Sequence, residues 1–188
     1  MTFRSTSPRD PPADAAYGGR VAYSTSVTAY SAGLLLLRLM LGLTMASHGT
    51  QKLFGWFGGH GIDATAAGFA HLGYRAPKAM AVLAGLCESL GGLGILLGLL
   101  TPLAAAALLG AMINALWVTW DGGFFAPKGV EYTLLIAVAT AAIALTGPGR
   151  YSVDAYLPGL RTYRLAYGVG AIVLAAVASC IVLLIFMR

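Results

Sequence analysis

The chain has 188 residues, of which 58% are hydrophobic and 10% are charged, and its formal net charge is +5. Soluble domains carry about 25% charged residues, and a chain this short cannot hide so much apolar surface from water. The basic residues are scattered in short segments instead of forming one stripe, so the positive charge does not indicate nucleic-acid binding. The composition predicts a membrane protein whose basic residues set its topology and contact anionic lipids.

The chain begins with a polar segment. Residues 1–29 are rich in Pro, Ser, Thr and Ala, with scattered charges and no helical or strand period. Such a composition predicts a disordered tail. It lacks the apolar stretch of a signal peptide, because no hydrophobic run begins before Gly33.

Five apolar segments follow, each close to the roughly 20 residues that a spanning helix needs. They run from about Tyr30 to His48, Ala79 to Leu100, Leu103 to Trp120, Val130 to Thr146 and Leu165 to Met187. Between the first two, residues 62–72 predict a short interfacial helix. Because only Thr101 and Pro102 separate the second and third segments, we expect these two helices to be antiparallel neighbours.

The predicted architecture is an all-α membrane protein, an antiparallel four-helix transmembrane bundle plus a fifth C-terminal transmembrane helix. The corresponding domains are the tail 1–29, a membrane domain 30–155, and a linker with the additional helix, 156–188. Arginines and lysines are slightly more frequent in the segments on the N-terminal side of the membrane. This bias predicts a cytoplasmic N-terminus.

Two ionisable residues stand near the middle of apolar segments, Arg38 in the first and Glu88 in the second. A charge at membrane depth costs about 2.5 to 3.5 kcal/mol on insertion, so each needs a partner. Antiparallel neighbours place their midpoints at similar depth, which predicts an Arg38–Glu88 ion pair inside the bundle. This pair could fix helix register only, or it could take part in chemistry.

Further polar residues fall at helical spacing and are expected to converge at one mouth of the bundle. Asn114 would lead from this mouth down to the Arg38–Glu88 pair. Alternatively, these residues have purely structural roles: they cap helix ends, extend to the lipid headgroups or anchor the helices at the membrane interface. The residues expected at the mouth are His48, Gln51, Lys52, Trp117, Asp121, Glu131 and Tyr132.

The sequence indicates no catalytic residue and no metal site. The three histidines are not spaced as ligand pairs, and the two cysteines, Cys87 and Cys180, are far apart and form no CxxC motif. No intrinsic cofactor is therefore expected, and any redox group would sit on a partner or be an exchangeable quinone.

Several motifs, taken together and in this order, resemble the DoxX family of bacterial membrane proteins. The resemblance extends from about Gly33 to Ala155 and leaves the tail and the fifth helix outside. One position departs from the family pattern, Ser89, where an aliphatic or aromatic residue is usual. The matching segments are Arg38–Leu39, His48–Gly59, Gly85–Gly92, Leu97–Pro102, Asn114, Gly122–Phe125, Glu131–Tyr132 and Thr146–Ser152.

The resemblance implies a four-helix unit in the bacterial cytoplasmic membrane. Similar proteins include a subunit of a thiosulfate:quinone oxidoreductase and mycobacterial members of a membrane oxidoreductase complex, while distant ones act as assembly chaperones or cargo receptors. It therefore implies a membrane subunit for quinone-linked sulfur or thiol redox chemistry. A non-catalytic anchor or assembly factor and a small-solute transporter stay open as alternatives. Expected partners are the lipid bilayer, other oxidoreductase subunits and further copies of the chain.

Overall fold

The computed structural model describes residues 26–125 and 127–187, so the predicted tail lies outside the described residues as far as residue 25. The helices begin and end close to the predicted positions, although the first is longer at both ends. They are α1 (Val27–Phe54), α2 (Gly61–His71), α3 (Pro77–Leu97), α4 (Thr101–Thr119), α5 (Glu131–Thr146) and α6 (Leu165–Phe186), with the short turns η2 (Trp56–Gly58), η3 (Trp120–Gly122) and η4 (Val153–Tyr156).

In the described part of the chain, four helices are long and apolar enough to cross a membrane: α1, α3, α4 together with η3, and α6. The predicted all-α membrane class is confirmed. The α5 helix is also apolar but has only 16 residues. At 1.5 Å per residue it is about 24 Å long, which is shorter than the hydrocarbon core of about 30 Å.

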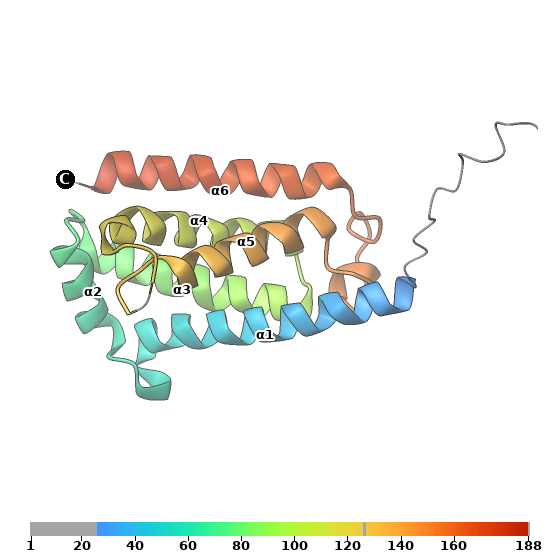
Figure 1. Cartoon of the computed structure of the whole chain (residues 1–188), viewed down its shortest axis with the longest axis horizontal. Coiled ribbons are helices and arrows are strands. Elements are labelled where there is room, and N and C mark those ends of the chain that lie inside the picture. Colours follow the sequence, from blue (N-terminus) through green and yellow to red (C-terminus); the bar gives the residue numbers. More distant parts are fainter. Residues whose placement is uncertain (1–25, 126, 188) are drawn as a thin grey trace, which may run out of the picture.

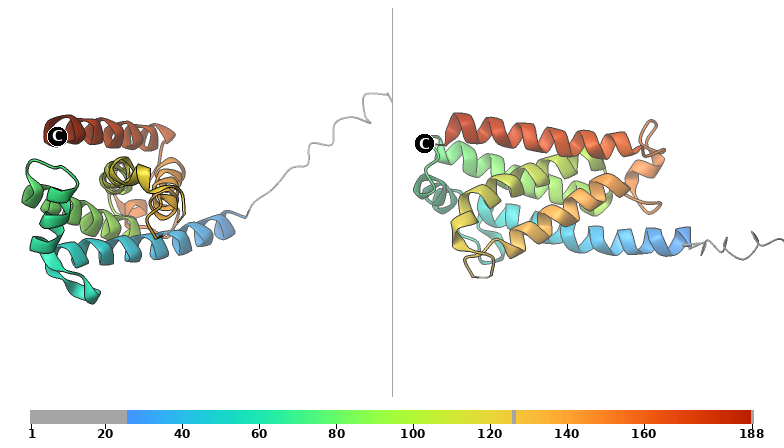
Figure 2. Two further views of the ribbon diagram at one scale, coloured as in Figure 1. Left: turned by 60° about the vertical axis from the view of Figure 1, so that its left-hand side comes forward. Right: turned by 45° about the horizontal axis from the view of Figure 1, so that its top comes forward.

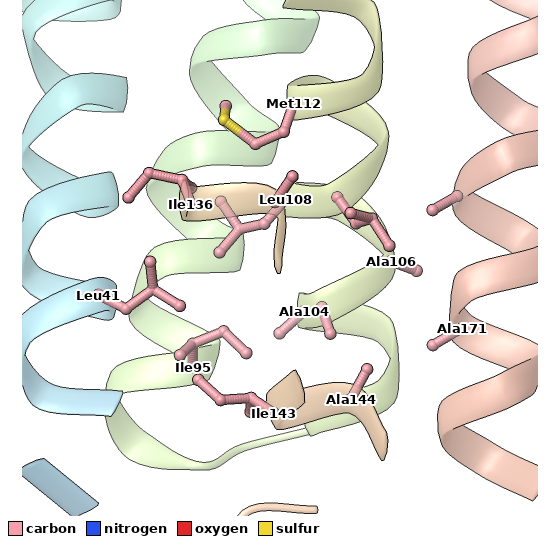
Figure 3. Packing of buried hydrophobic residues seen from close by; sticks show 14 of the residues in the cluster. Leu41, Ile95, Ala104, Ala106, Leu108, Met112, Ile136, Ile143, Ala144 and Ala171 are labelled. Carbon is pink, nitrogen blue, oxygen red and sulfur yellow. The ribbon is translucent and has the colours of Figure 1, made fainter. Parts of the chain in front are cut away.

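The helices α1, α3, α4 and α5 run along one axis, and α6 covers the side of α4 and α5 that faces away from α1 (Figure 1). The short α2 lies across one end of this bundle, as the turned views also show (Figure 2). We call this the α2 end. The core between the helices is built from medium-sized aliphatic side chains such as Leu41, Ile95, Leu108 and Ile143 (Figure 3).

The backbones of α1 and α3 touch at glycines. A Cβ atom on Gly42 would lie 2.6 Å from the carbonyl oxygen of Gly92 and 2.6 Å from the amide nitrogen of Leu96. One contact further along, Gly49 faces Gly85 and Ser89 in the same way. Small residues permit such close approach between helices in lipid. These contacts fix the register of α1 against α3.

The α6 helix is joined to the bundle by small residues and by polar contacts. Ala171, Ala175 and Ser179 are buried on its inner face. The Ser179 hydroxyl donates a hydrogen bond of 2.9 Å to the carbonyl of Gly110 in α4. At the α2 end, the amide of Arg75 donates to the carbonyl of Phe186 at 2.7 Å. The additional helix is therefore an integral part of the fold.

We expect the substitution Gly42→Ala to destabilise the protein by about 1 to 3 kcal/mol, because the new methyl group overlaps the backbone of α3. Gly33→Ala on the same helix is the matched control. Open space surrounds that position, and alanine there should be neutral or stabilise by up to about 1 kcal/mol. Unfolding in mixed micelles, followed by circular dichroism, measures both. Equal stability of the two variants would contradict the proposed α1–α3 register contact.

Candidate functional site: a pocket at the α2 end

The predicted Arg38–Glu88 ion pair is wrong. The Arg38 side chain is 1% exposed and donates to the carbonyls of Ile95 and Leu96 at 2.9 and 3.0 Å. It also donates to the carbonyls of Pro148 and Tyr151 at 2.7 and 2.9 Å. The midpoint argument failed because α1 and α3 are offset along their axes, so that their midpoints do not lie at the same level. Since Gly42 faces Gly92 and Leu96, Arg38 lies level with the C-terminal end of α3 and not with Glu88.

Asp154 occupies the same corner of the fold, between α3 and α4. Its carboxylate accepts hydrogen bonds from the amides of Leu100 and Thr101 at 2.7 and 2.8 Å. Its own amide donates to the carbonyl of Gly98 at 2.8 Å. Arg38 thus donates hydrogen bonds to the carbonyls left without helical partners where α3 ends. Asp154 accepts hydrogen bonds from the amides left without helical partners where α4 begins. Both residues hold the α3–α4 corner at the end of the bundle opposite α2.

The partner of Glu88 is Lys52. The Lys52 Nζ atom lies 2.5 Å from the Glu88 Oε2 atom. Their side chains are 29% and 6% exposed, so the carboxylate is buried while the amine still reaches the surface. Because Gly49 packs against Gly85 and Ser89, residues at the end of α1 lie level with Glu88. The register of the two helices therefore selects this pair.

A second polar pair lies beside the first. The Nε2 atom of His48 lies 3.1 Å from the hydroxyl of Tyr132 at the start of α5. The two ring centroids are 5.9 Å apart. One turn of α1 separates His48 from Lys52, so α1 presents both pairs on one face. In the structure, His48, Lys52 and Tyr132 from α1 and α5 therefore lie close together.

These two pairs line a cavity of about 490 Å³, which we call the pocket. Its wall is mostly apolar and is contributed by every helix of the described chain from α1 to α6. Asn114 lines it too, and its side-chain oxygen accepts a hydrogen bond of 3.4 Å from the Tyr74 hydroxyl. Burial raises the pKa of Tyr74, which keeps that hydroxyl a donor. Residues that represent the apolar wall are Met45, Phe69, Leu83, Val118 and Val182.

A smaller cavity of about 320 Å³ is also lined by His48 and Lys52. We call it the vestibule. Polar atoms make up much of its wall, and the Gln51 amide at its edge donates to the carbonyl of Phe57 at 3.1 Å. The complete lining is His48, Gln51, Lys52, Gly58, Gly59, His60, Ala64 and Thr65.

The remaining predicted residues lie outside both cavities. Trp117 is 65% exposed, as expected of a side chain that faces lipid or headgroups. Asp121 is exposed in η3. Glu131 opens α5 next to Tyr132 and its amide donates to the carbonyl of Phe124. The polar mouth is thus built mainly from α1, α3 and α5.

Sequence reasoning missed several residues that matter. Tyr74, Cys87 and Ser179 line the pocket, and Asp154 holds the opposite corner. Tyr74 carried a usable signal, since a tyrosine between an interfacial helix and a span has both an apolar ring and a polar tip. Ser179 and Asp154 carried none, because no helical period connected them with the other polar groups.

The fold and the pocket define a multi-pass α-helical membrane protein with an amphipathic cavity near one end of its bundle. The DoxX family model matches residues 33–120. A similar protein is the uncharacterized membrane protein Rv3486 of Mycobacterium tuberculosis (strain ATCC 25618 / H37Rv), which is 30% identical over 133 residues, or 64% of this chain and 78% of that protein. The chain belongs to the DoxX family. No solved structure matches it.

We expect Arg38→Met to destabilise the protein by at least about 3 kcal/mol, because it leaves buried carbonyls without donors. The matched control is Met40→Leu. Met40 is on the same helix and 69% exposed, so this change should stay within about 0.5 kcal/mol. Unfolding in mixed micelles compares the two. A small effect of Arg38→Met would contradict its assignment to the α3–α4 corner.

Lys52→Met should cost more stability than Glu88→Gln. The first change leaves an uncompensated carboxylate in a buried position, a loss of about 3 kcal/mol or more. The second leaves an amine that can still reach water. The double variant Lys52→Met with Glu88→Gln should regain part of the stability lost in Lys52→Met. Additive losses in the same unfolding assay would mean that the two side chains do not interact.

Proposed function

We propose that this protein is a quinone-binding membrane subunit of an oxidoreductase complex that serves sulfur or thiol redox chemistry in the bacterial cytoplasmic membrane. The observation that carries the proposal is the pocket, an apolar cavity with two polar pairs gathered on one side. A volume of about 490 Å³ lies in the range of small-molecule sites, about 300 to 1,000 Å³.

The side chains in the pocket suit a flat ring that carries two carbonyl groups and an apolar tail. The Lys52 amine and the Tyr132 hydroxyl can donate hydrogen bonds to ring oxygens, and His48 can donate or accept according to its tautomer. The wall formed by residues such as Leu83 and Val118 would hold the apolar tail. These residues would bind and orient the quinone.

When bound, a quinone supplies reversible transfer of two electrons and two protons. The pocket wall includes one cysteine, Cys87, and a single thiol cannot cycle between a dithiol and a disulfide by itself. The electrons would therefore come from a second subunit, a soluble oxidoreductase with a dithiol or a flavin. The link to sulfur chemistry rests on the family resemblance of the sequence.

A second candidate is a non-catalytic anchor or assembly factor for a soluble oxidoreductase. It is favoured by the aromatic side chains of η2, Trp56 and Phe57, which are 58% and 71% exposed at the α2 end. Phe57 has a backbone φ of 53°, a left-handed conformation that is strained for a bulky residue. An exposed loop with a fixed backbone conformation could contact a partner or the lipid headgroups.

Transport of small solutes is supported less well than binding. The pocket lies at the α2 end, and the opposite end is packed around Arg38 and Asp154, which are both buried. With the N-terminus in the cytoplasm, the α2 end would face outward. Partner subunits, or further copies of this chain, would then meet the protein there or along its lipid-facing sides. Crosslinking in native membranes followed by mass spectrometry identifies them.

The full chain in nanodiscs should bind decylubiquinone or a short-chain menaquinone, and direct titration measures the affinity. Tyr132→Phe should weaken binding about 2- to 10-fold, the effect of one lost hydrogen bond. Ala107→Phe, which fills the pocket, should abolish binding. The bulk control is Ala142→Phe, since Ala142 is exposed on α5 and lines neither cavity.

Two outcomes would contradict the quinone site. One is no binding of either quinone by the folded native chain. The other is binding that Ala107→Phe and Ala142→Phe weaken equally, because that would place the quinone on the outer surface. A pocket that yields only phospholipid on extraction, with no quinone displacing it, would favour the anchor.

A further inference from the structure

Two side chains border on both the pocket and the vestibule. His48 and Lys52 are the residues that line both cavities, one turn apart on α1. On the pocket side they meet Tyr132 and Glu88, at 3.1 and 2.5 Å. On the vestibule side they meet a polar wall that includes Gln51, His60 and Thr65. The wall between an apolar and a polar cavity is therefore built from groups that carry exchangeable protons.

We propose that His48 and Lys52 form a proton-exchange wall, through which the ring end of the pocket is connected to water at the α2 end of the bundle. This inference rests on the proposed quinone site. Reduction of the ring takes up two electrons from the soluble partner and two protons, and oxidation returns both. The protons would pass between the vestibule and the pocket by way of these side chains.

The geometry gives the exchange a direction. The vestibule opens beside α2 and the segment after η2, whereas Arg38 and Asp154 are buried at the other end with every Arg38 donor nitrogen engaged by a carbonyl. Protons would therefore enter and leave on one side of the membrane only. The proposed cytoplasmic N-terminus makes that side the outer one.

Several titratable groups surround His48 and are part of the same wall. Lys52 lies on its own helix, Glu88 on α3, Tyr132 and its neighbour Glu131 on α5, and His60 follows η2. The contact of the Lys52 amine with the Glu88 carboxylate keeps a positive and a negative charge together beside the ring site.

Diethyl pyrocarbonate, a water-borne reagent that modifies unprotonated imidazole nitrogens, tests access across the wall. The chain has three histidines, His48, His60 and His71. His60 lines the vestibule but not the pocket, and His71 is exposed at the end of α2. In nanodiscs containing the full chain, we expect all three to be modified. Decylubiquinone should slow modification of His48 several-fold and leave His60 and His71 unchanged, as read by mass spectrometry of peptides.

The outcomes separate this inference from the quinone site itself. If decylubiquinone binds by direct titration but His48 is unmodified without it, water does not reach the wall and the inference is wrong. If binding occurs and His48 modification is unaffected, the ring does not contact the wall, and the inference is wrong again. If no quinone binds at all, the proposed function fails and the exchange wall fails with it.

The pH dependence of binding provides a second readout that a merely structural role would not change. His48→Gln, which keeps a hydrogen-bonding side chain but removes the imidazole, should change the pH profile of decylubiquinone binding. His60→Gln should leave it as in the native chain. Identical profiles for the native chain and His48→Gln would exclude His48 from the exchange.

Discussion

The contact between the backbones of α1 and α3 determines which partners the α1 residues Arg38 and Lys52 meet inside this protein. Gly42 against Gly92, and Gly49 against Gly85 and Ser89, leave no room for a Cβ atom and no freedom to slide. A shift of one turn would move each α1 side chain by about 5.4 Å along α3. In the observed register Lys52 meets Glu88, and Arg38 meets the carbonyls that end α3. Tight packing of small residues thus decides which charges meet.

The same register divides the buried charges between two tasks. At one end, Arg38 and Asp154 form hydrogen bonds with the backbone groups of two helix ends. These bonds stabilise the fold and occupy the polar atoms of both side chains. At the other end, the Lys52–Glu88 pair and the His48–Tyr132 pair border on cavities and keep polar atoms available to a ligand. A charge in the membrane-spanning part of a chain is therefore not evidence of chemistry until its partners are known.

The sequence predicted the helices well, because long apolar runs bounded by Gly, Pro and Thr are strong signals. It also predicted that His48, Lys52 and Tyr132 lie at one end of the bundle, whereas Glu88 was expected deeper, beside Arg38. The Arg38–Glu88 pair was wrong because depth was judged from the midpoints of two helices that are offset along their axes. Asp154 was missed because its task depends on where two other helices end. The local pattern of apolar residues identifies the helices. Which side chains pair between two helices depends on the register of those helices, and the register is determined by their packing.

The hydrogen bond between the Arg75 amide and the Phe186 carbonyl has a consequence for how this protein is produced and tagged. Because α6 supplies Ala178, Ser179 and Val182 to the pocket wall, the cavity is incomplete until that segment has left the ribosome. During translation the first five helices would present the cavity sideways to the translocon or to lipid. A fusion tag added on the C-terminal side of α6 would also begin close to the contact between α6 and the α2–α3 connection. An affinity handle on the other terminus keeps that contact undisturbed.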